Sequence, residues 1–417
     1  MSKIKLFLHQ DNLLNTTYEF NRVAYYVDMG LGKTFIGSEK LWELNTPYNI
    51  VVCQKSKIDD WKEHFEEFYP EYNVIIFDKQ SLEIIPQESV LIINYDKVWR
   101  RPELEHLRDF TMMLDESSLI KNEKSNRSKF ILNNLKPDNV ILLSGTPVSG
   151  KYEEIISQVN LLGWKMSKDL FMKQYVKREW DDLDGGWKIT GYKNIDRLKR
   201  KLRQYGAVFM KTEEVFDLPA QNHINVTVKS TKQYKDFSTH HMCEYDGEMF
   251  IGDTPSKAKL YQRQFAGYMN NNKLLRLKEL IESTNDRLII FYNFKKEYEV
   301  IAKLCNELER PISTVNGDIR DLEAYETQVN SITLIQYQAG AMGLNLQKSN
   351  KIIYFTLTDK SELFEQSKKR THRIGQEKPC FYYYLLTQGS VEWRMLDVLK
   401  MRKDYTDELF EQEEIKS

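Results

Sequence analysis

The sequence predicts an α/β protein with two lobes, each a parallel sheet covered on both faces by helices. The first observation is that short apolar runs rich in Val and Ile alternate with amphipathic helical patterns in both halves of the chain. The second is length, because 417 residues suit two or three domains at ~100–200 residues each. The third is composition: 41% hydrophobic and 29% charged residues are typical of a globular protein.

The strands expected in the first half are continuous apolar runs, and segments such as KTFIGSEKLWEL (33–44) between them have helical character. The expected strands are AYYVD (24–28), YNIVVC (48–53), YNVIIF (72–77), SVLIIN (89–94), FTMMLD (110–115) and NVILLS (139–144). Apolar strands separated by helices indicate a parallel sheet that is buried on both faces.

The second half repeats this plan, with the helix KEYEVIAKLCNEL (296–308) between its first two strands. Its expected strands are RLIIFY (287–292), SITLIQYQ (331–338), KIIYFT (351–356) and CFYYYLL (380–386). We therefore expect one lobe over residues 1–215, with a helical basic insertion at about 165–212. The other lobe is expected over 225–417, with a helical insertion at about 228–280.

Charge is unevenly distributed, although the formal net charge is only −1. Lys165 to Arg203 contains twelve Lys and Arg against six Asp and Glu, so a polyanion would be bound by a local patch. The four cysteines are scattered and no pair has metal-ligand spacing, which indicates reduced thiols and a cytoplasmic protein. No apolar run approaches the ~20 residues of a membrane span, so no membrane partner is expected.

A glycine-rich turn follows the first expected strand, in the order Met29, Gly30, Leu31, Gly32, Lys33, Thr34. Its glycines allow the backbone N–H groups to point inward, Lys33 supplies a positive charge for the β- and γ-phosphates, and Thr34 offers a hydroxyl to Mg²⁺. The full P-loop pattern has Gly where this chain has Val27. The strand before the turn and the helix after it favour a nucleotide site.

Two acidic residues stand where the strand FTMMLD ends: Asp115 is its last residue and Glu116 follows it. Asp115 can hold Mg²⁺ through water, and Glu116 can orient an attacking water. Parallel α/β sheets bind ligands at the carboxyl ends of their strands, which is where these residues stand. The alternative is an Asp-Glu-Ser cap that opens a helix.

Two arginines stand three residues apart in KKRTHRIGQ (368–376), namely Arg370 and Arg373. Two guanidinium groups so placed suit an anion such as a phosphoryl group. A basic run by itself is more often a solvated helix face.

Taken in order, six motifs resemble the Swi/Snf-type ATPases of helicase superfamily two. They are DMGLGKT (28–34), VVCQKSKIDDW (51–61), DESSLIKN (115–122), LLSGTP (142–147), QYQAGAMGLNL (336–346) and QSKKRTHRIGQ (366–376). The resemblance covers about Leu6 to Arg394. It implies two RecA-like lobes that hold ATP and Mg²⁺ between them, and an ATP hydrolase that depends on nucleic acid.

The resemblance also implies roles for individual residues in ATP hydrolysis. Lys33, Asp115, Glu116, Arg370 and Arg373 would be catalytic, the last two as arginine fingers, and Thr34 and Asp115 would hold the metal. Gln10 would read adenine, and Ser144, Gly145 and Thr146 would couple hydrolysis to movement. The remaining nucleotide-binding residues would be those of the loop 29–34 together with Gly343, Asn345 and Gln366.

The implied partner is DNA, most simply duplex or branched, bound by a monomer that tracks along it without parting its strands. Backbone contacts would come from Lys55, Ser56, Lys57, Tyr95, Asn293, Phe294, Lys295 and Gln338. The basic segment 165–203 is a second candidate surface. Three tryptophans, Trp164 directly before the segment and Trp180 and Trp187 within it, could stack on bases, but core packing is favoured for them.

The chain departs from the family pattern at three places. Ser117 and Ser118 replace Ala-His, Gly150 stands where Asn is common, and Asn316-Gly317-Asp318 replaces Asp-Gly. None of these removes a catalytic group. Two alternatives stay open: a strand-unwinding or annealing helicase on DNA or RNA, and an adaptor that binds DNA without hydrolysing ATP.

Overall fold

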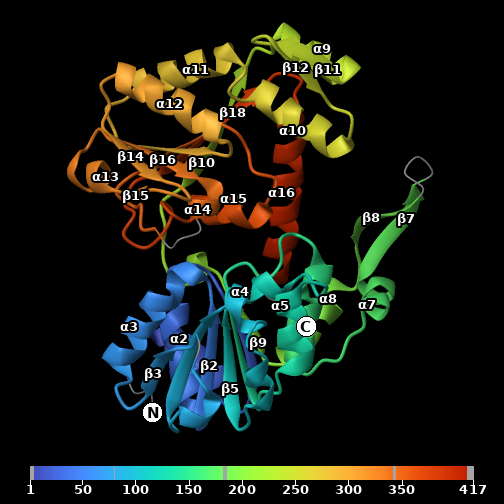
Figure 1. The fold of residues 1–417 in the computed structure, drawn as a ribbon, viewed down its shortest axis with the longest axis vertical. Coiled ribbons are helices and arrows are strands. Elements are labelled where there is room, and N and C mark those ends of the chain that lie inside the picture. The colour runs from blue at the N-terminus through green and yellow to red at the C-terminus, as the bar shows by residue number, and fades with distance from the viewer. Residues whose placement is uncertain (1–3, 79, 182–185, 341–343, 411–417) are drawn as a thin grey trace, which may run out of the picture. The chain divides into compact units, whose positions relative to one another are not determined.

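The computed structural model describes residues 4–78, 80–181, 186–340 and 344–410. The chain divides into two compact units, each built on its own seven-stranded sheet (Figure 1). Lobe one comprises Met1–Phe216 together with Asp404–Ser417, and lobe two comprises Asp217–Lys403. Within the described ranges, no helix combines the length and apolarity needed to cross a membrane.

The sheet of lobe one has the strand order β3-β4-β2-β5-β6-β1-β9, and every neighbouring pair is parallel. Its strands are β1 (Arg22–Val27), β2 (Tyr48–Cys53), β3 (Asn73–Ile76), β4 (Ser89–Asn94), β5 (Phe110–Asp115), β6 (Asn139–Ser144) and β9 (Ala207–Met210). Its longer helices are α1 (Leu8–Thr16), α2 (Lys33–Leu44), α3 (Ile58–Phe68), α7 (Lys168–Tyr175) and α8 (Ile195–Gln204), and its shorter ones are α4 (Tyr95–Val98), α5 (Asn126–Lys129) and α6 (Ile156–Leu161). All residues of β4 and β6 are buried, as expected for strands covered on both faces.

The sheet of lobe two has the order β10-β18-β17-β13-β16-β14-β15, and only the pair β14–β15 is antiparallel. Its strands are β10 (Gln221–Val228), β13 (Leu288–Tyr292), β14 (Ile312–Val315), β15 (Arg320–Asp321), β16 (Ile332–Gln336), β17 (Lys351–Tyr354) and β18 (Cys380–Thr387). Its helices are α9 (Lys232–His240), α10 (Pro255–Ala266), α11 (Asn271–Glu282), α12 (Lys295–Glu307), α13 (Glu323–Thr327), α14 (Tyr337–Gly340), α15 (Ser361–Lys368) and the start of α16 (Val391–Phe410). The predicted α/β fold of two parallel-sheet lobes is confirmed.

The insertions are less helical than the sequence suggested. Between α7 and α8 the chain forms the antiparallel hairpin of β7 (Val176–Asp181) and β8 (Gly186–Tyr192). Residues 207–210, expected inside the insertion, are instead the edge strand β9, which pairs with β1. The lobe-two insertion likewise contains a hairpin, β11 (Met242–Tyr245) and β12 (Glu248–Ile251). These hairpin strands lack the continuous apolar runs of the sheet strands, so the charged composition of the segments was interpreted as helix.

The end of the described chain belongs to lobe one, although the sequence placed all of 225–417 in the second lobe. Tyr152 donates its hydroxyl to the carbonyl of Tyr405 at 2.8 Å and to the Glu408 carboxylate at 2.5 Å. Leu409 and Phe410 are buried in the core of lobe one. These contacts join residues some 250 positions apart, so no local pattern could predict them.

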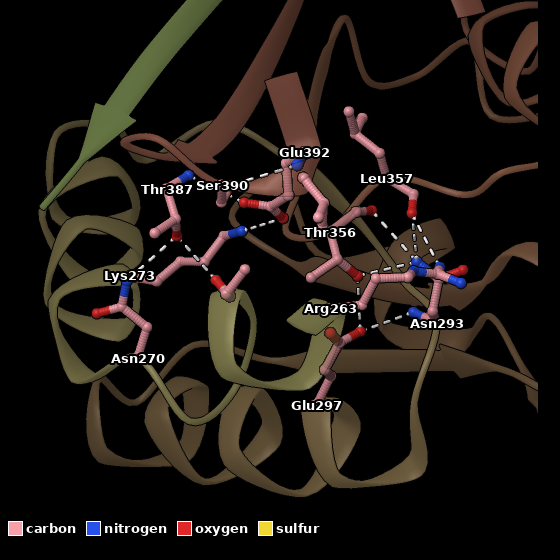
Figure 2. Close-up of polar contacts among 12 residues, drawn as sticks. Arg263, Asn270, Lys273, Asn293, Glu297, Thr356, Leu357, Thr387, Ser390 and Glu392 are labelled. Carbon is pink, nitrogen blue, oxygen red and sulfur yellow. Dashed lines mark hydrogen bonds and ion pairs between the residues drawn. The ribbon is translucent and has the colours of Figure 1, made fainter. Parts of the chain in front are cut away.

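Buried polar side chains fix the helices of lobe two to its sheet (Figure 2). Lys273 on α11 forms an ion pair with Glu392 on α16 at 2.5 Å, and both side chains are almost fully buried. Glu392 also accepts a hydrogen bond from the Thr387 backbone at 2.9 Å, at the end of β18. On the same side, Glu297 accepts from the backbone of Asn293 and from the Thr356 hydroxyl. The network ties α11, α12 and α16 to the strand ends.

Candidate nucleotide site and nucleic-acid contacts

The residues expected to bind nucleotide in lobe one lie at the carboxyl ends of adjacent strands. β1 and β5 both pair with β6, with Tyr26 opposite Ser144 and Asp115 opposite Leu143. The loop 28–34 after β1, the acidic pair after β5 and the loop after β6 therefore share one edge of the sheet. This is the edge at which parallel α/β sheets bind ligands.

The glycine-rich loop has a backbone conformation at two positions that residues with a side chain rarely adopt. Gly30 and Gly32 have φ of +92° and +77°, in the left-handed region. A Cβ at Gly32 would lie 2.0 Å from Gln10 Nε2, so the loop packs directly against α1. Gln10 is buried and donates to the Leu31 carbonyl at 3.2 Å, while its Oε1 accepts from the Phe7 backbone at 2.9 Å. The glutamine thus borders the phosphate loop.

The Lys33 ammonium lies over this loop and faces the other two strand ends. Its Nζ donates to Val27 O at 2.9 Å and to Asp28 O at 3.3 Å. A Cβ built at Gly145 would lie 3.3 Å from the same nitrogen. The positive charge of Lys33 also acts on Asp115. The Lys33 ammonium therefore lies among the glycine-rich loop, the Asp115 carboxylate and the segment Ser144–Thr146.

Asp115 is held by two aromatic residues. The Trp61 indole N–H donates to Asp115 Oδ2 at 3.0 Å, and the Tyr95 hydroxyl donates to the Asp115 carbonyl at 2.9 Å. Burial raises the pKa of Asp115, while the Trp61 hydrogen bond and the charge of Lys33 oppose that rise. A bound divalent cation would favour the ionised carboxylate further.

Glu116 has a left-handed backbone with φ of +53°, an uncommon conformation for a residue with a side chain. The Ser144 hydroxyl lies 3.4 Å from Glu116 Oε2, and the Thr146 N–H donates to the same hydroxyl at 3.1 Å. The expected water-orienting residue and the expected coupling segment are thus in contact. Strained backbone of this kind is concentrated at functional sites.

These groups fit ATP with Mg²⁺. The open space beside Gly30, the N-terminus of α2 and the Lys33 ammonium form a cradle suited to phosphates. Thr34 and Asp115 would hold the metal, which supplies charge neutralisation at the phosphoryl oxygens.

In lobe two, the two expected arginines follow helix α15, which ends at Lys368. Arg370 is almost completely buried, and its carbonyl accepts from the Leu346 backbone at 3.0 Å. Arg373 is partly exposed and its guanidinium donates to the Asn345 side-chain carbonyl. Gln366 is buried on α15. Asn345 and Arg373 are therefore brought together, while Gly343 lies outside the described residues.

The nucleic-acid residues expected in lobe one divide into two groups. Lys55 and Ser56 are exposed and Lys57 is partly exposed, in a short 3-10 turn directly after β2. Tyr95, in contrast, is buried and its hydroxyl bonds to Asp115. Tyr95 therefore supports the acidic residue and does not offer the surface contact that the sequence suggested.

In lobe two, three of the expected nucleic-acid residues line a pocket of about 160 Å³, namely Asn293, Phe294 and Gln338. Its wall also contains Arg263 and Lys360, which the sequence analysis missed. The Asn293 amide donates to Thr356 Oγ1 at 2.9 Å and to the Leu357 carbonyl at 3.1 Å, so this side chain shapes the pocket (Figure 2). Lys295 lies on the surface, 3.7 Å from Asp318.

Comparison with known proteins identifies two family domains in the chain. Residues 26–287 match the SNF2-related domain, and residues 272–375 match the helicase conserved C-terminal domain. The first match spans more than half of the chain.

Two curated relatives illustrate the similarity. The chain is 24% identical to SWI/SNF-related matrix-associated actin-dependent regulator of chromatin subfamily A member 1 of Mus musculus, over 90% of this chain and 40% of that protein. It is also 24% identical to the ATP-dependent DNA helicase DDM1 of Arabidopsis thaliana, over 88% of this chain and 56% of that protein. The chain thus spans about half the length of these relatives.

Among solved structures, the Sulfolobus solfataricus SWI2/SNF2 ATPase core in complex with dsDNA is similar over 97% of this chain and 93% of that chain. The sequence identity is 20% and the TM-score is 0.46. The two domain matches carry the conclusion: the chain belongs to the SNF2-related family, the Snf2-type ATPases of helicase superfamily two.

Proposed function

We propose that the chain is an ATP-dependent DNA translocase, which uses ATP hydrolysis to move along double-stranded or branched DNA. The observation that supports this most directly is the convergence of Lys33, Asp115, Glu116 and Ser144 at one edge of the lobe-one sheet. A protein that only bound DNA would have no use for this combination. Family membership supports the same reaction, and one relative is named as an ATP-dependent DNA helicase.

In the proposed reaction, the loop 29–34 binds the phosphates and Gln10 reads the adenine. Lys33 neutralises charge on the β- and γ-phosphates, and Glu116 orients the water that attacks the γ-phosphorus. The bond to the bridging oxygen then breaks, so that ADP and inorganic phosphate form.

We assign Arg370 and Arg373 to stabilisation of the charge that the γ-phosphoryl group spreads in its transition state. Of the two, Arg373 has the more accessible guanidinium, held in place by Asn345. An arginine finger is worth ~10³–10⁵ in rate. Arg373→Ala should therefore abolish most turnover while ATP still binds, and equal turnover in the variant and the parent would contradict the assignment.

The proposed contacts with DNA are made to phosphate and sugar, so binding should be independent of sequence and weakened by salt. Lys55, Ser56 and Lys57 would contact the backbone from lobe one. Lys295 and Gln338, with the pocket beside Asn293 and Phe294, would contact it from lobe two.

The deciding experiment measures ATP turnover with no nucleic acid, with blunt duplex DNA, with branched DNA and with RNA. We expect stimulation by DNA that disappears in Lys33→Ala and Glu116→Gln, while Lys62→Ala, an exposed control on α3, behaves as the parent. ATP turnover that ignores every nucleic acid would contradict the proposal.

A translocase that leaves the strands paired should displace a triplex-forming third strand but should not separate a blunt duplex. Separation of the duplex strands would favour the unwinding helicase. Tight DNA binding without any ATP turnover would favour the adaptor.

A further inference from the structure

The hairpin of β7 and β8 presents two large aromatic side chains to solvent. Trp180 is 54% exposed and Trp187 is 60% exposed, whereas Trp164, in the same segment, is buried in the core. The sequence analysis favoured core packing for all three, and for the two hairpin tryptophans this was wrong. Figure 1 shows the hairpin extending outward beyond α7 and α8. Exposing two indoles is costly unless they have a binding partner.

One face of the hairpin is aromatic and cationic. Trp180 pairs with Trp187 across the strands, and Arg178 pairs with Ile189, so these four side chains share a face. The indole rings lie 5.6 Å apart at 82°, and the Arg178 guanidinium lies 4.8 Å from the Trp187 ring centre. Glu179 pairs with Lys188 on the opposite face. The aromatic face therefore carries the positive charge of Arg178, whereas the Glu179 side chain lies on the other face.

The base of the hairpin is fixed to the core of lobe one. The Tyr192 ring packs against Tyr152 with ring centres 4.4 Å apart at 31°, and against Tyr405 edge-on with ring centres 5.0 Å apart. Its hydroxyl donates to the Glu153 carboxylate at 2.8 Å. The Lys193 backbone donates to the Tyr175 carbonyl at 2.9 Å. The aromatic face is thus presented from a firmly held base.

We propose that this face binds unpaired bases of DNA, with Trp180 and Trp187 stacking on bases and Arg178 contacting a phosphate. Duplex bases are already stacked on each other, so only an unpaired or frayed base offers a free ring face to an indole. Base–aromatic stacking tolerates any sequence because every base has a ring face. Since the two indoles are nearly perpendicular, a single base cannot lie flat on both, so each ring would take its own base.

This inference rests on the proposed function and adds to it a preference for DNA with a single-stranded portion. The exposed residues Lys193 and Arg197, close after β8, add positive charge near the base of the hairpin. Aromatic platforms next to basic residues are the usual arrangement for binding single strands. A duplex translocase with such a hairpin would favour forks and gaps over blunt duplex.

The test compares binding of the full chain to a forked DNA with single-stranded arms and to a blunt duplex of equal length, by fluorescence anisotropy. In the double variant Trp180→Ala/Trp187→Ala we expect the affinity for the fork to fall about tenfold or more. Affinity for the blunt duplex and duplex-stimulated ATP turnover should stay within about twofold of the parent, because paired bases offer no free ring face to the indoles. The double variant Trp180→Phe/Trp187→Phe, which retains ring faces, should recover much of the loss.

The matched control is Glu179→Ala/Lys188→Ala on the opposite face, which should bind the fork as the parent does. Unchanged fork binding in the double alanine variant would overturn the inference, and so would an equal loss on fork and blunt duplex. The proposed function fails separately, if the parent protein itself shows no ATP turnover stimulated by DNA.

Discussion

The Trp61 indole N–H donates a hydrogen bond to Asp115 Oδ2 at 3.0 Å. Trp61 comes from α3 and Asp115 from the end of β5, so a helix on one face of the sheet holds the carboxylate proposed to bind Mg²⁺. Trp61 is itself buried and packs on Phe65 and His64. The carboxylate is therefore oriented by a side chain that is fixed in the core.

Trp61→Phe should raise the Mg²⁺ concentration needed for half-maximal ATP turnover by about tenfold. A hydrogen bond to a charged group is worth about 1.5–3 kcal/mol, and the phenyl ring retains most of the packing. Titration of activity with Mg²⁺ measures the effect. Trp99→Phe, which changes a partly buried tryptophan elsewhere in lobe one, is the control, and an equal shift in both variants would contradict a specific role for Trp61.

Ser144→Ala should uncouple hydrolysis from movement. Its hydroxyl lies between Glu116 Oε2 and the Thr146 N–H, so the substitution removes the contact between the Glu116 carboxylate and the loop after β6. We expect triplex displacement per ATP hydrolysed to fall severalfold while turnover falls less. A proportional loss of both activities would indicate that Ser144 only supports catalysis.

Gln10→Ala should raise the KM for ATP and reduce discrimination against GTP, because an amide that reads adenine also rejects the wrong base. His9 offers a matched control, since its Nε2 lies 3.1 Å from the same Leu31 carbonyl to which Gln10 donates. His9→Ala should alter the phosphate loop without changing the preference for ATP. If both variants lose discrimination equally, Gln10 acts only by holding the loop.

His64 should make lobe one less stable at acid pH. Burial among aromatic rings lowers the pKa of His64 from 6.5 to about 4. Between these values the unfolded chain binds the proton and the folded chain does not, so stability is full above about pH 6.5 and falls as the pH decreases toward 4. Allowing for solvent screening, the contribution is about 1–2 kcal/mol.

His64→Gln, which retains a hydrogen-bonding group near Ser38, removes this titration. The difference in free energy of unfolding between parent and variant should change between pH 6.5 and 4 and stay constant from pH 7 to 8. Denaturant unfolding at each pH gives the comparison. A difference that is independent of pH throughout would show that His64 does not titrate in this window.

Lys273→Met should destabilise lobe two by about 3–5 kcal/mol, because it leaves the buried carboxylate of Glu392 without its cation. Burial raises the pKa of Glu392 and the Lys273 charge opposes this, so the single variant should favour the protonated acid. The double variant Lys273→Met/Glu392→Gln should recover much of the loss. Thermal unfolding of the parent, Lys273→Met, Glu392→Gln and the double variant measures the coupling, and additive effects would argue against a mutual interaction.

The sequence was sufficient for the sheet strands that are long and apolar. All ten strands predicted from such runs occur in the two sheets, because continuous Val- and Ile-rich runs have few alternatives to a buried parallel strand. The sheet strands β9, β10, β14 and β15 were missed. Three of them have four residues or fewer and carry no usable periodicity, and β10 is rich in polar residues instead of forming a continuous apolar run. Both hairpins were missed because their charged residues resemble a solvated helix.

In the candidate site, too, residues in recognisable motifs could be predicted from the sequence, whereas a contact that depends on tertiary packing could not. Lys33, Asp115 and Glu116 stand in motifs whose spacing indicates their chemistry, and the structure brings the strand ends that carry them together. Trp61 was overlooked although it ends one of the recognised motifs, because a tryptophan in a helix reads as core. Its proximity to Asp115 depends on how α3 crosses the sheet, which no local pattern specifies.

Along the chain, the β7–β8 hairpin lies between two strands that are both neighbours of β1 in the sheet. β6 precedes it and β9 follows it, and both pair with β1, while Thr212 just after β9 donates to the Asp28 carboxylate at 3.2 Å. A mechanical load applied at the tryptophans would therefore be transmitted along covalent backbone to both neighbours of the strand that leads into the nucleotide loop. If the hairpin binds DNA as proposed, tension on a DNA end would act on the two strands beside the proposed nucleotide loop, within a single sheet.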